Sequence, residues 1–234
     1  MQNKTIKERI QRKWYWIAKL ICRTFVMICF RWKCYGLENI PKEGSFLVVC
    51  NHQSFLDPIF CGSRMKRHMC FLARDTLFEN WFFGPLIRSV FAIPVKREQG
   101  DLSAMRKVIE VLKQGDGVCL YPEGTRTEDG KISPFKSGLG LLCRRGNAAI
   151  VPAVIDGAFE CWPRTQKLFK TGMPIIIHFG KAISANEAKE MGDEKLADFW
   201  VFGSNRDAGI FAGCLSISGP TSCWRRPTGE NRCF

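Results

Sequence analysis

The sequence predicts an α/β fold in which a mixed, largely parallel sheet is flanked by helices. An N-terminal amphipathic, membrane-associated helix is expected to precede this sheet. Two observations predict the sheet. Six short runs rich in Val, Ile, Phe and Cys are almost continuously apolar, which is typical of strands buried on both faces. Helical segments alternate with these runs, as they do in strand–helix–strand units. A chain of 234 residues is long enough for one sizeable core.

The elements are expected in a regular order after an N-terminal helix. Strands are predicted at residues 46–50, 69–73, 91–95, 118–121, 149–154 and 174–179. Helices are predicted at about 58–66, 76–89, 102–114 and 137–145. Asp101 and Ser103 mark the start of the third of these helices, and Gly115 marks its end. Functional loops are then expected at the strand ends.

The basic charge is concentrated at the N-terminus. The whole chain carries a net charge of +13, and residues 1–35 contribute nine Lys or Arg against one acid, Glu8. On a helical projection one side is basic, and the opposite side carries Trp14, Ile17, Ala18, Ile21, Phe25, Ile28 and Cys29. This pattern predicts a helix that lies in an anionic lipid interface. The alternatives are a helix docked on its own domain or, less favoured, a nucleic-acid contact, for which no binding motif is present.

Three regions follow from this pattern. We expect a basic membrane-binding helix at 1–35, a catalytic domain at 36–198 and an atypical, poorly ordered tail at 199–234. The tail contains five Gly and three Cys without helical periodicity, as expected of a divergent or frameshifted terminus. The twelve cysteines of the chain are scattered, without C-x-x-C pairs or zinc spacing. We therefore expect reduced, mostly buried thiols in a cytosolic compartment, and no metal site.

The stretch CNHQSFLDP at residues 50–58 places polar side chains directly after an apolar strand. Asp57 and Pro58 are typical of a helix start, with Asp at the N-cap and Pro at the first helical position. His52 then lies on the loop before the helix, where Asp57 can accept its ring N–H across the corner. A carboxylate in that position fixes the tautomer and makes the other nitrogen a general base. Without further motifs, a capping Asp57 and a structural His52 would be the favoured interpretation of the pattern.

Further motifs favour the catalytic interpretation. The block NHQSFLD resembles the N-H-x-S-x-x-D block of the glycerolipid acyltransferases, the family of 1-acyl-sn-glycerol-3-phosphate acyltransferases. Three more blocks are similar to those of this family and follow in order. They are FAIPVKR at 91–97, YPEGTRT at 121–127 and IVPAVIDG at 150–157. The resemblance covers roughly residues 30–198.

The resemblance implies acyl transfer from a thioester to the sn-2 hydroxyl of lysophosphatidate, giving phosphatidate. His52 would be the base and Asp57 would orient it, with no covalent acyl-enzyme. It implies no cofactor, with acyl-CoA or acyl-acyl-carrier-protein as the second substrate. It also implies an enzyme at the cytoplasmic face of the cell membrane.

The resemblance further implies a phosphate site. Its members would be Glu123, Gly124, Thr125 and Arg126 of the third block, with Arg97 and Arg74. A planar guanidinium suits bidentate phosphate binding. For Glu123 a structural role, holding Arg126 or backbone amides, remains an open alternative. Two alternatives remain for the function: an acyltransferase for another lysolipid, and a catalytically silent membrane-binding protein.

Overall fold

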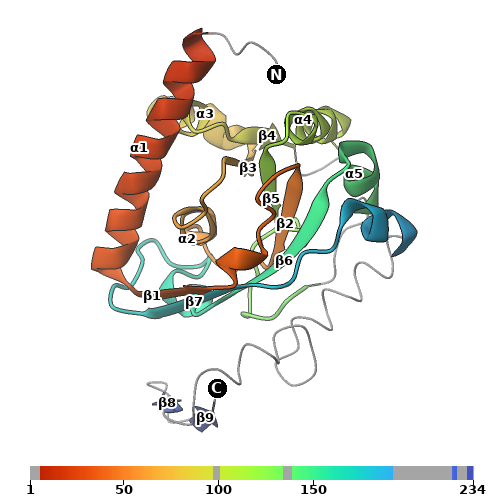
Figure 1. The fold of residues 1–234 in the computed structure, drawn as a ribbon. Coiled ribbons are helices and arrows are strands. Elements are labelled where there is room, and N and C mark those ends of the chain that lie inside the picture. Colours follow the sequence, from red (N-terminus) through yellow and green to blue (C-terminus); the bar gives the residue numbers. More distant parts are fainter. Residues whose placement is uncertain (1–5, 97–100, 134–138, 192–222, 226–230, 234) are drawn as a thin grey trace.

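A computed structural model describes residues 6–96, 101–133, 139–191, 223–225 and 231–233 of the chain. Its centre is a seven-stranded sheet with the order β1-β7-β6-β2-β5-β3-β4 (Figure 1). The strands are β1 (Arg31–Tyr35), β2 (Phe46–Cys50), β3 (Met69–Arg74), β4 (Ile93–Val95), β5 (Gly117–Leu120), β6 (Ala149–Asp156) and β7 (Pro174–Phe179). All neighbours pair in parallel except β6 and β7. The predicted mixed, largely parallel sheet is confirmed.

Helices cover both faces of the sheet. They are α1 (Ile6–Cys29), α2 (Asp57–Gly62), α3 (Phe83–Ser89), α4 (Leu102–Lys113), α5 (Leu139–Gly146) and α6 (Ala158–Cys161), with 3-10 turns η1 (Leu37–Asn39) and η2 (Asp75–Phe78). Residues of β2 alternate between the two faces. Phe46, Val48 and Cys50 pack in a core cluster with α1 and α2, whereas Leu47 and Val49 pack with α4 and α5. Burial on both sides explains why β2 is apolar throughout.

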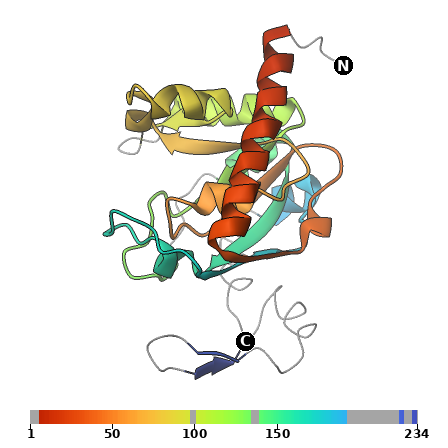
Figure 2. The ribbon, with the colours of Figure 1, turned by 90° about the vertical axis from the view of Figure 1, so that its left-hand side faces the viewer.

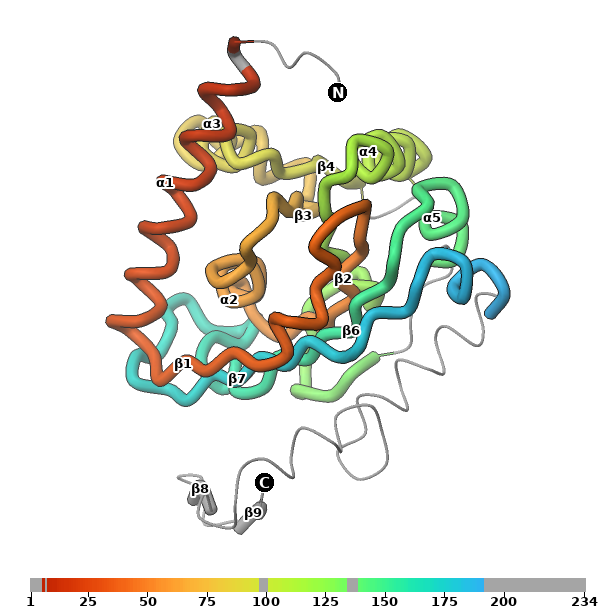
Figure 3. The backbone as a smooth tube through the Cα atoms, in the orientation of Figure 1, coloured from red at the N-terminus to blue at the C-terminus, as the bar shows by residue number. Residues whose placement is uncertain are grey.

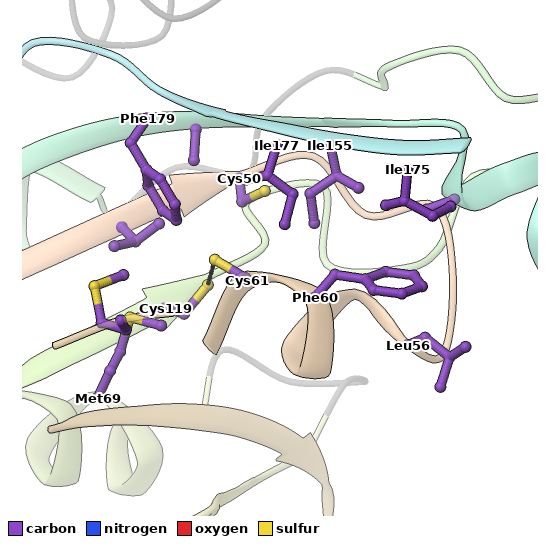
Figure 4. Packing of buried hydrophobic residues seen from close by; sticks show 14 of the residues in the cluster. Cys50, Leu56, Phe60, Cys61, Met69, Cys119, Ile155, Ile175, Ile177 and Phe179 are labelled. Atoms are coloured by element: carbon purple, nitrogen blue, oxygen red, sulfur yellow. Dashed lines mark hydrogen bonds between the residues drawn. The ribbon is translucent and has the colours of Figure 1, made fainter. Parts of the chain in front are cut away.

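Figure 4 shows the core on the α1–α2 side, where α2 meets the sheet. Phe60 of α2 lies against Ile155, Ile175 and Ile177 of β6 and β7. The Sγ atoms of Cys61 and Cys119 lie 3.9 Å apart, and the nine cysteines described outside the tail are free, with six of them buried. These thiols fill the core as small apolar groups, as the sequence predicted.

Four elements differ from the predictions. The N-terminal helix ends at Cys29, and Arg31–Tyr35 form the edge strand β1 instead of continuing it (Figure 3). The helix predicted at 76–89 is divided into η2 and α3, and the helix predicted at 58–66 ends at Gly62. The strand predicted at 91–95 begins at Ile93, because Phe91 has a left-handed φ of 62° that a strand does not accommodate.

In the predicted tail, short antiparallel strands at Cys223–Arg225 and Asn231–Cys233 are described. The remaining tail residues, on which the prediction of poor order rests, lie outside the described residues.

The long helix α1 has three distinct faces. One face packs on the domain, with Tyr15 and Val26 buried and Phe25 half-buried. A second face is apolar but exposed, and it carries Ile6, Ile10, Trp14, Ile17, Ile21 and Ile28. The remaining face carries the basic residues Arg9, Lys19 and Arg23 together with the exposed apolar residues Trp16, Leu20 and Met27. The predicted apolar face is therefore divided between the domain and the outside. In the described part of the chain, no helix combines the length and hydropathy needed to cross a bilayer.

A partly buried charge network attaches the N-terminal half of α1 to the domain. The two terminal NH2 groups of the Arg12 guanidinium donate to the two carboxylate oxygens of Asp116, and His68 Nδ1 lies 3.3 Å from the same carboxylate. The hydroxyl of Tyr15 donates to the Met69 carbonyl at 3.2 Å nearby. Burial opposes ionisation of Asp116, but the nearby His68 and the hydrogen bonds from Arg12 hold its pKa at about 2. The network therefore contributes stability when Asp116 is ionised.

Replacing Asp116 should weaken this attachment in a pH-dependent way. Because the folded pKa of about 2 lies below the ordinary 3.8, the stabilisation is present above about pH 4 and is lost as the pH falls toward 2. Asp116→Asn should therefore lower Tm at pH 7 by roughly 2–8 °C, for a loss of about 1–2 kcal/mol. The control Glu110→Gln, in an exposed pair with Lys107, should leave Tm nearly unchanged. Equal melting of Asp116→Asn and wild type at pH 7 would show that the network is not stabilising.

Candidate active site

The loop after β2 is fixed to the sheet by its first residue. Asn51 is 1% exposed, and its side chain pairs with the backbone of Ile155 on the neighbouring strand β6. Asn51 Nδ2 donates to the Ile155 carbonyl at 2.9 Å, and Asn51 Oδ1 accepts from the Ile155 N–H at 2.8 Å. These two hydrogen bonds extend the sheet by one residue and set the position at which His52 leaves it.

His52 and Asp57 form the predicted pair. His52 Nδ1 lies 2.8 Å from Asp57 Oδ2, with 14% of the His52 side chain and none of the Asp57 side chain exposed. The same Oδ2 atom accepts the backbone N–H groups of Gln53 at 2.6 Å and Ser54 at 2.8 Å. This arrangement assigns the ring proton to Nδ1 and leaves the Nε2 lone pair as the basic site. The predicted contact across the strand–helix corner is thus present.

One detail of that prediction is wrong. Asp57 is the first residue of α2 and not its N-cap, a position that Leu56 occupies without a side-chain hydrogen bond. Instead, Asp57 Oδ2 accepts the ring N–H of His52 and the backbone N–H groups of Gln53 and Ser54 in the preceding loop. Because the carboxylate turns back toward the loop, it holds the imidazole rather than the helix terminus.

An aromatic ring packs against one face of the imidazole, whose edge is held by Asp57. Tyr121 follows β5, and its ring stacks on that of His52 with centroids 4.2 Å apart and an angle of 19° between the planes. The Thr127 N–H also donates to the His52 carbonyl at 2.9 Å. The first and third sequence blocks therefore meet at His52, because the parallel strands β2 and β5 end at the same edge of the sheet.

Glu123 joins three loop segments. It is 4% exposed, and its two carboxylate oxygens accept the backbone N–H groups of His52 at 2.7 Å and Ser133 at 2.9 Å. Burial raises the pKa of Glu123, although the amides of Ser133 and His52 oppose that change. These contacts favour the alternative in which Glu123 holds backbone amides over its assignment to the phosphate site.

Glu123→Gln should therefore lower stability. A Gln side chain places an NH2 group against one of the two backbone donors, and a buried donor without a partner costs about 1–3 kcal/mol. Tm should fall by roughly 2–12 °C, and amide hydrogen exchange should become faster at His52 or Ser133. Glu128→Gln is the matched control, since Glu128 lies in the same loop, exposed and paired with Arg164. Unchanged Tm and unchanged exchange in Glu123→Gln would contradict the structural role.

The Arg126 side chain stacks on an aromatic ring of the first block. Its Cζ atom lies 3.3 Å from the centroid of the Phe55 ring, and Phe55 in turn contacts Trp162 with centroids 5.0 Å apart. The backbone turn before it uses Gly124 at a φ of 72°, a conformation that glycine adopts without strain. Thr125 lies half-buried between them. This cation–π contact fixes the plane of the guanidinium.

The remaining candidates are only partly located. Arg74 is exposed at the C-terminal end of β3, the edge at which β5 also ends. Arg97 lies outside the described residues. Sequence reasoning missed Tyr121 and Phe55 as parts of the site. The available signal was their aromatic character inside blocks that otherwise carry polar groups.

The cysteines closest to the site are not suited to nucleophilic catalysis. Burial raises the pKa of Cys50 to about 11 and that of Cys119 well above its ordinary value. Both thiols are therefore protonated at neutral pH, whereas the thiolate is the reactive form. Within the described ranges, no three His, Cys, Asp or Glu side chains are grouped as metal ligands. The His52–Asp57 pair is the catalytic candidate that this geometry provides.

Comparisons with known proteins place the chain among acyltransferases. A family model described as Acyltransferase matches residues 31–156, which are 126 of the 234 residues. The 1-acyl-sn-glycerol-3-phosphate acyltransferase of Bacillus subtilis is 34% identical over 147 residues, covering 62% of this chain and 71% of that protein. A chloroplastic 1-acyl-sn-glycerol-3-phosphate acyltransferase of Brassica napus is 29% identical over 193 residues, covering 80% of this chain and 55% of that protein.

A solved structure has the same fold. The crystal structure of the 1-acyl-sn-glycerophosphate acyltransferase PlsC from Thermotoga maritima superposes with a TM-score of 0.71 at 22% sequence identity. The match covers 97% of this chain and 86% of that one. At this identity the comparison supports the α/β architecture described above.

Proposed function

Since the chain belongs to the acyltransferase family, we propose that it transfers an acyl group from a thioester donor to the sn-2 hydroxyl of 1-acyl-glycerol-3-phosphate. The product is phosphatidate. The relatives named above carry the activity in their names, which supports this substrate class. The observation that carries the proposal is the buried Asp57 carboxylate holding His52 Nδ1 at 2.8 Å, beside the loop that presents Arg126.

The proposed reaction needs one base and no covalent intermediate. His52 Nε2 removes the proton from the lipid hydroxyl while the hydroxyl oxygen attacks the thioester carbonyl. The tetrahedral intermediate then collapses, the C–S bond breaks, and the leaving thiolate takes the proton from the imidazolium. Asp57 stabilises the imidazolium and holds the ring, and Tyr121 limits its rotation. General-base assistance of this kind contributes about 10²–10⁴-fold to the rate.

The phosphate of the acceptor is assigned to Arg126, with Arg74 at the same edge of the sheet and Arg97 as a further candidate. The ring of Phe55 orients the Arg126 guanidinium, and the planar fork of this group suits a pair of phosphate oxygens. Glu123, Gly124 and Thr125 would shape the turn that carries Arg126. The second substrate is proposed to be acyl-CoA or acyl-acyl-carrier-protein, with no cofactor.

Arg126→Ala should mainly raise the KM for the lysolipid. Loss of a charge-assisted contact costs about 1.5–3 kcal/mol, which is roughly 10–150-fold in kcat/KM. The KM for the acyl donor should stay nearly unchanged, and Arg126→Lys should recover part of the loss, because an ammonium cannot form the planar fork. The exposed Arg164, 3.0 Å from Glu128, provides the control Arg164→Ala. A defect confined to the donor KM would remove Arg126 from the phosphate site.

We further propose that α1 binds an anionic membrane surface, at the cytoplasmic face of the cell membrane. The support is its exposed apolar face beside exposed basic residues, while the face with Tyr15 and Val26 anchors the helix to the domain. An apolar face that remains exposed after docking has no partner in the described part of the domain. A lipid interface would cover it, and the basic residues would attract anionic headgroups.

The function is tested by assaying the purified full chain with a panel of lysolipids and both donor types. Phosphatidate should form from lysophosphatidate, and lysophosphatidylcholine should be used poorly because its phosphate is a diester carrying a bulky cation. Equal use of the two acceptors would move the proposal to another lysolipid. Absence of any product, with a normal melting transition, would favour a silent membrane-binding protein.

A further inference from the structure

A second apolar surface lies on the segment between β3 and β4. Five large apolar residues project from η2, α3 and the turn between them. We call them the aromatic turn patch: Trp81 is 86% exposed, Phe82 66%, Phe83 41%, Leu86 40% and Leu77 37%. The rings of Trp81 and Phe82 lie 5.8 Å apart. Single exposed apolar residues are common on soluble proteins, but a continuous run of this kind indicates an interaction surface.

Packing and hydrogen bonds hold this turn in place, so the exposure of Trp81 and Phe82 is a property of the folded structure. Phe78 is buried and anchors η2 in the domain. Asn80 Oδ1 accepts the backbone N–H groups of Phe82 at 3.1 Å and Phe83 at 2.8 Å, which fixes the turn before α3. Arg88 closes the other end, because its guanidinium donates to the Phe78 carbonyl at 2.9 Å and stacks on the Phe78 ring. The rings of Trp81 and Phe82 therefore point outward on a fixed support.

This patch adjoins α1. Gln11 Nε2 donates to the Arg88 carbonyl at 3.1 Å, and Trp14 Nε1 donates to Ser89 Oγ at 2.8 Å. Figure 2 shows α1 in front of the sheet with α3 beside its N-terminal half. Trp14 belongs to the exposed apolar face of α1, so the two apolar surfaces meet at the end of α3. The exposed apolar face of α1 and the aromatic turn patch are therefore neighbours, joined through Trp14 and Ser89.

The charges indicate what covers this surface. The aromatic turn patch is itself close to neutral, because the exposed Arg74 and Arg88 are balanced by Asp75 and Glu79. The excess positive charge comes from α1, which carries exposed Arg9, Lys13 and Arg23 against Glu8. Aromatic rings beside a cationic helix suit the interfacial region of an anionic bilayer, where Trp is enriched. η2 also follows directly from β3, at the edge of the sheet where His52 and Arg126 lie.

We propose that the aromatic turn patch is a second lipid contact, which enters the bilayer interface beside α1. With α1 alone on the membrane, only the apolar face of one helix limits rotation of the domain about the helix axis. A second contact at the C-terminal edge of the sheet adds a constraint away from this axis and holds the site loops toward the lipid. The orientation is useful only if the proposed lysolipid acylation holds, whereas the lipid contact itself does not depend on it.

The test compares the full-length double variant Trp81→Ala/Phe82→Ala with wild type. Binding is measured by sedimentation with vesicles of phosphatidylglycerol and phosphatidylcholine. The apparent Kd for lipid should rise at least about tenfold, because two aromatic side chains lose their apolar burial. Activity on a short-chain lysophosphatidate below its micellar concentration should stay unchanged. The matched control is Leu102→Ala, a 69% exposed residue at the start of α4, which should bind vesicles as wild type does.

Three outcomes would overturn the proposal. Unchanged vesicle binding by the double variant would remove the patch from the lipid surface. An equal loss of activity on the monodisperse substrate would show that the substitutions act on the fold or the site. A wild-type dimer in the absence of lipid that the double variant dissociates would assign the patch to a second copy of the chain. If wild type acylates no lysolipid but the double variant alone loses vesicle binding, the lipid contact stands and the proposed function fails.

Discussion

Replacing His52 with Ala is expected to lower kcat by about 10²–10⁴-fold, because the substitution removes the only proposed proton acceptor. The KM values for both substrates should change little, since the imidazole contributes to the transition state rather than to ground-state binding. The effect on stability should be modest. The His52 side chain is 14% exposed and packs on one side against Tyr121. The measurement is steady-state kinetics with the purified variant, together with its Tm.

A second stacked pair provides the matched control. His178 of β7 stacks on Tyr35 of β1 with ring centroids 4.8 Å apart and an angle of 16° between the planes. His178→Ala therefore removes the same side chain from the same kind of contact, on β1 and β7 at one side of the sheet. It should leave kcat unchanged. If His52→Ala kept most of its activity, or if both variants lost activity equally, His52 would not be the base.

Asp57→Asn is expected to lower kcat by about 10²-fold or more while preserving most of the loop geometry. The amide oxygen of Asn can still accept the N–H groups of Gln53 and Ser54, which now bind Asp57 Oδ2. What the variant lacks is the negative charge that stabilises the imidazolium. The loss should therefore appear in kcat more than in Tm. Asp57→Ala should differ, because it also leaves two buried N–H groups without an acceptor and should lower Tm clearly.

A readout beyond the rate separates orientation from simple damage. In wild type the Nδ1 proton of His52 should give a low-field NMR signal typical of a hydrogen bond to a carboxylate, and the signal should shift or disappear in Asp57→Asn. A variant that keeps the signal and the rate would show that the Asp57 charge is not needed. A variant that loses the loop fold, seen as a fall in Tm equal to that of Asp57→Ala, would make Asp57 a structural residue only.

The parts of the fold that could be predicted are those with a strong local signal. The bounds predicted for β2 and β7 agree with the structure, because both strands have apolar runs bounded by turns. The helix α4 begins at the predicted Leu102, where Asp101 accepts the N–H groups of Ser103 and Ala104, and it ends within a residue of the prediction, before Gly115. The edge strand β1 was missed. Its sequence RWKCY is polar on one side, and only its pairing with β7 makes it a strand.

The site was predictable where one motif contained both partners, as for His52 and Asp57. Contacts between residues of different motifs could not be predicted. Tyr121 on the His52 ring, Glu123 on the His52 N–H and Phe55 under Arg126 each depend on β2 and β5 lying side by side. A single sequence carries no record of that pairing. The sequence placed Trp14, Ile17 and Ile21 on an apolar face of the N-terminal helix, and these side chains are exposed in the structure. It did not show which part of that face the domain covers, because an apolar helical face has the same pattern whether a domain or a membrane covers it.

The central claim is that His52, held by Asp57, catalyses direct acyl transfer without an acyl-enzyme. The most direct test is a single-turnover experiment in which excess full-length enzyme is mixed with a radiolabelled acyl thioester, with and without lysophosphatidate. The account predicts that the label passes to phosphatidate when the acceptor is present, that no label stays on denatured protein when it is absent, and that His52→Ala forms almost no product. Label that remains covalently bound to the wild-type protein, or rapid phosphatidate formation by His52→Ala, would contradict the account.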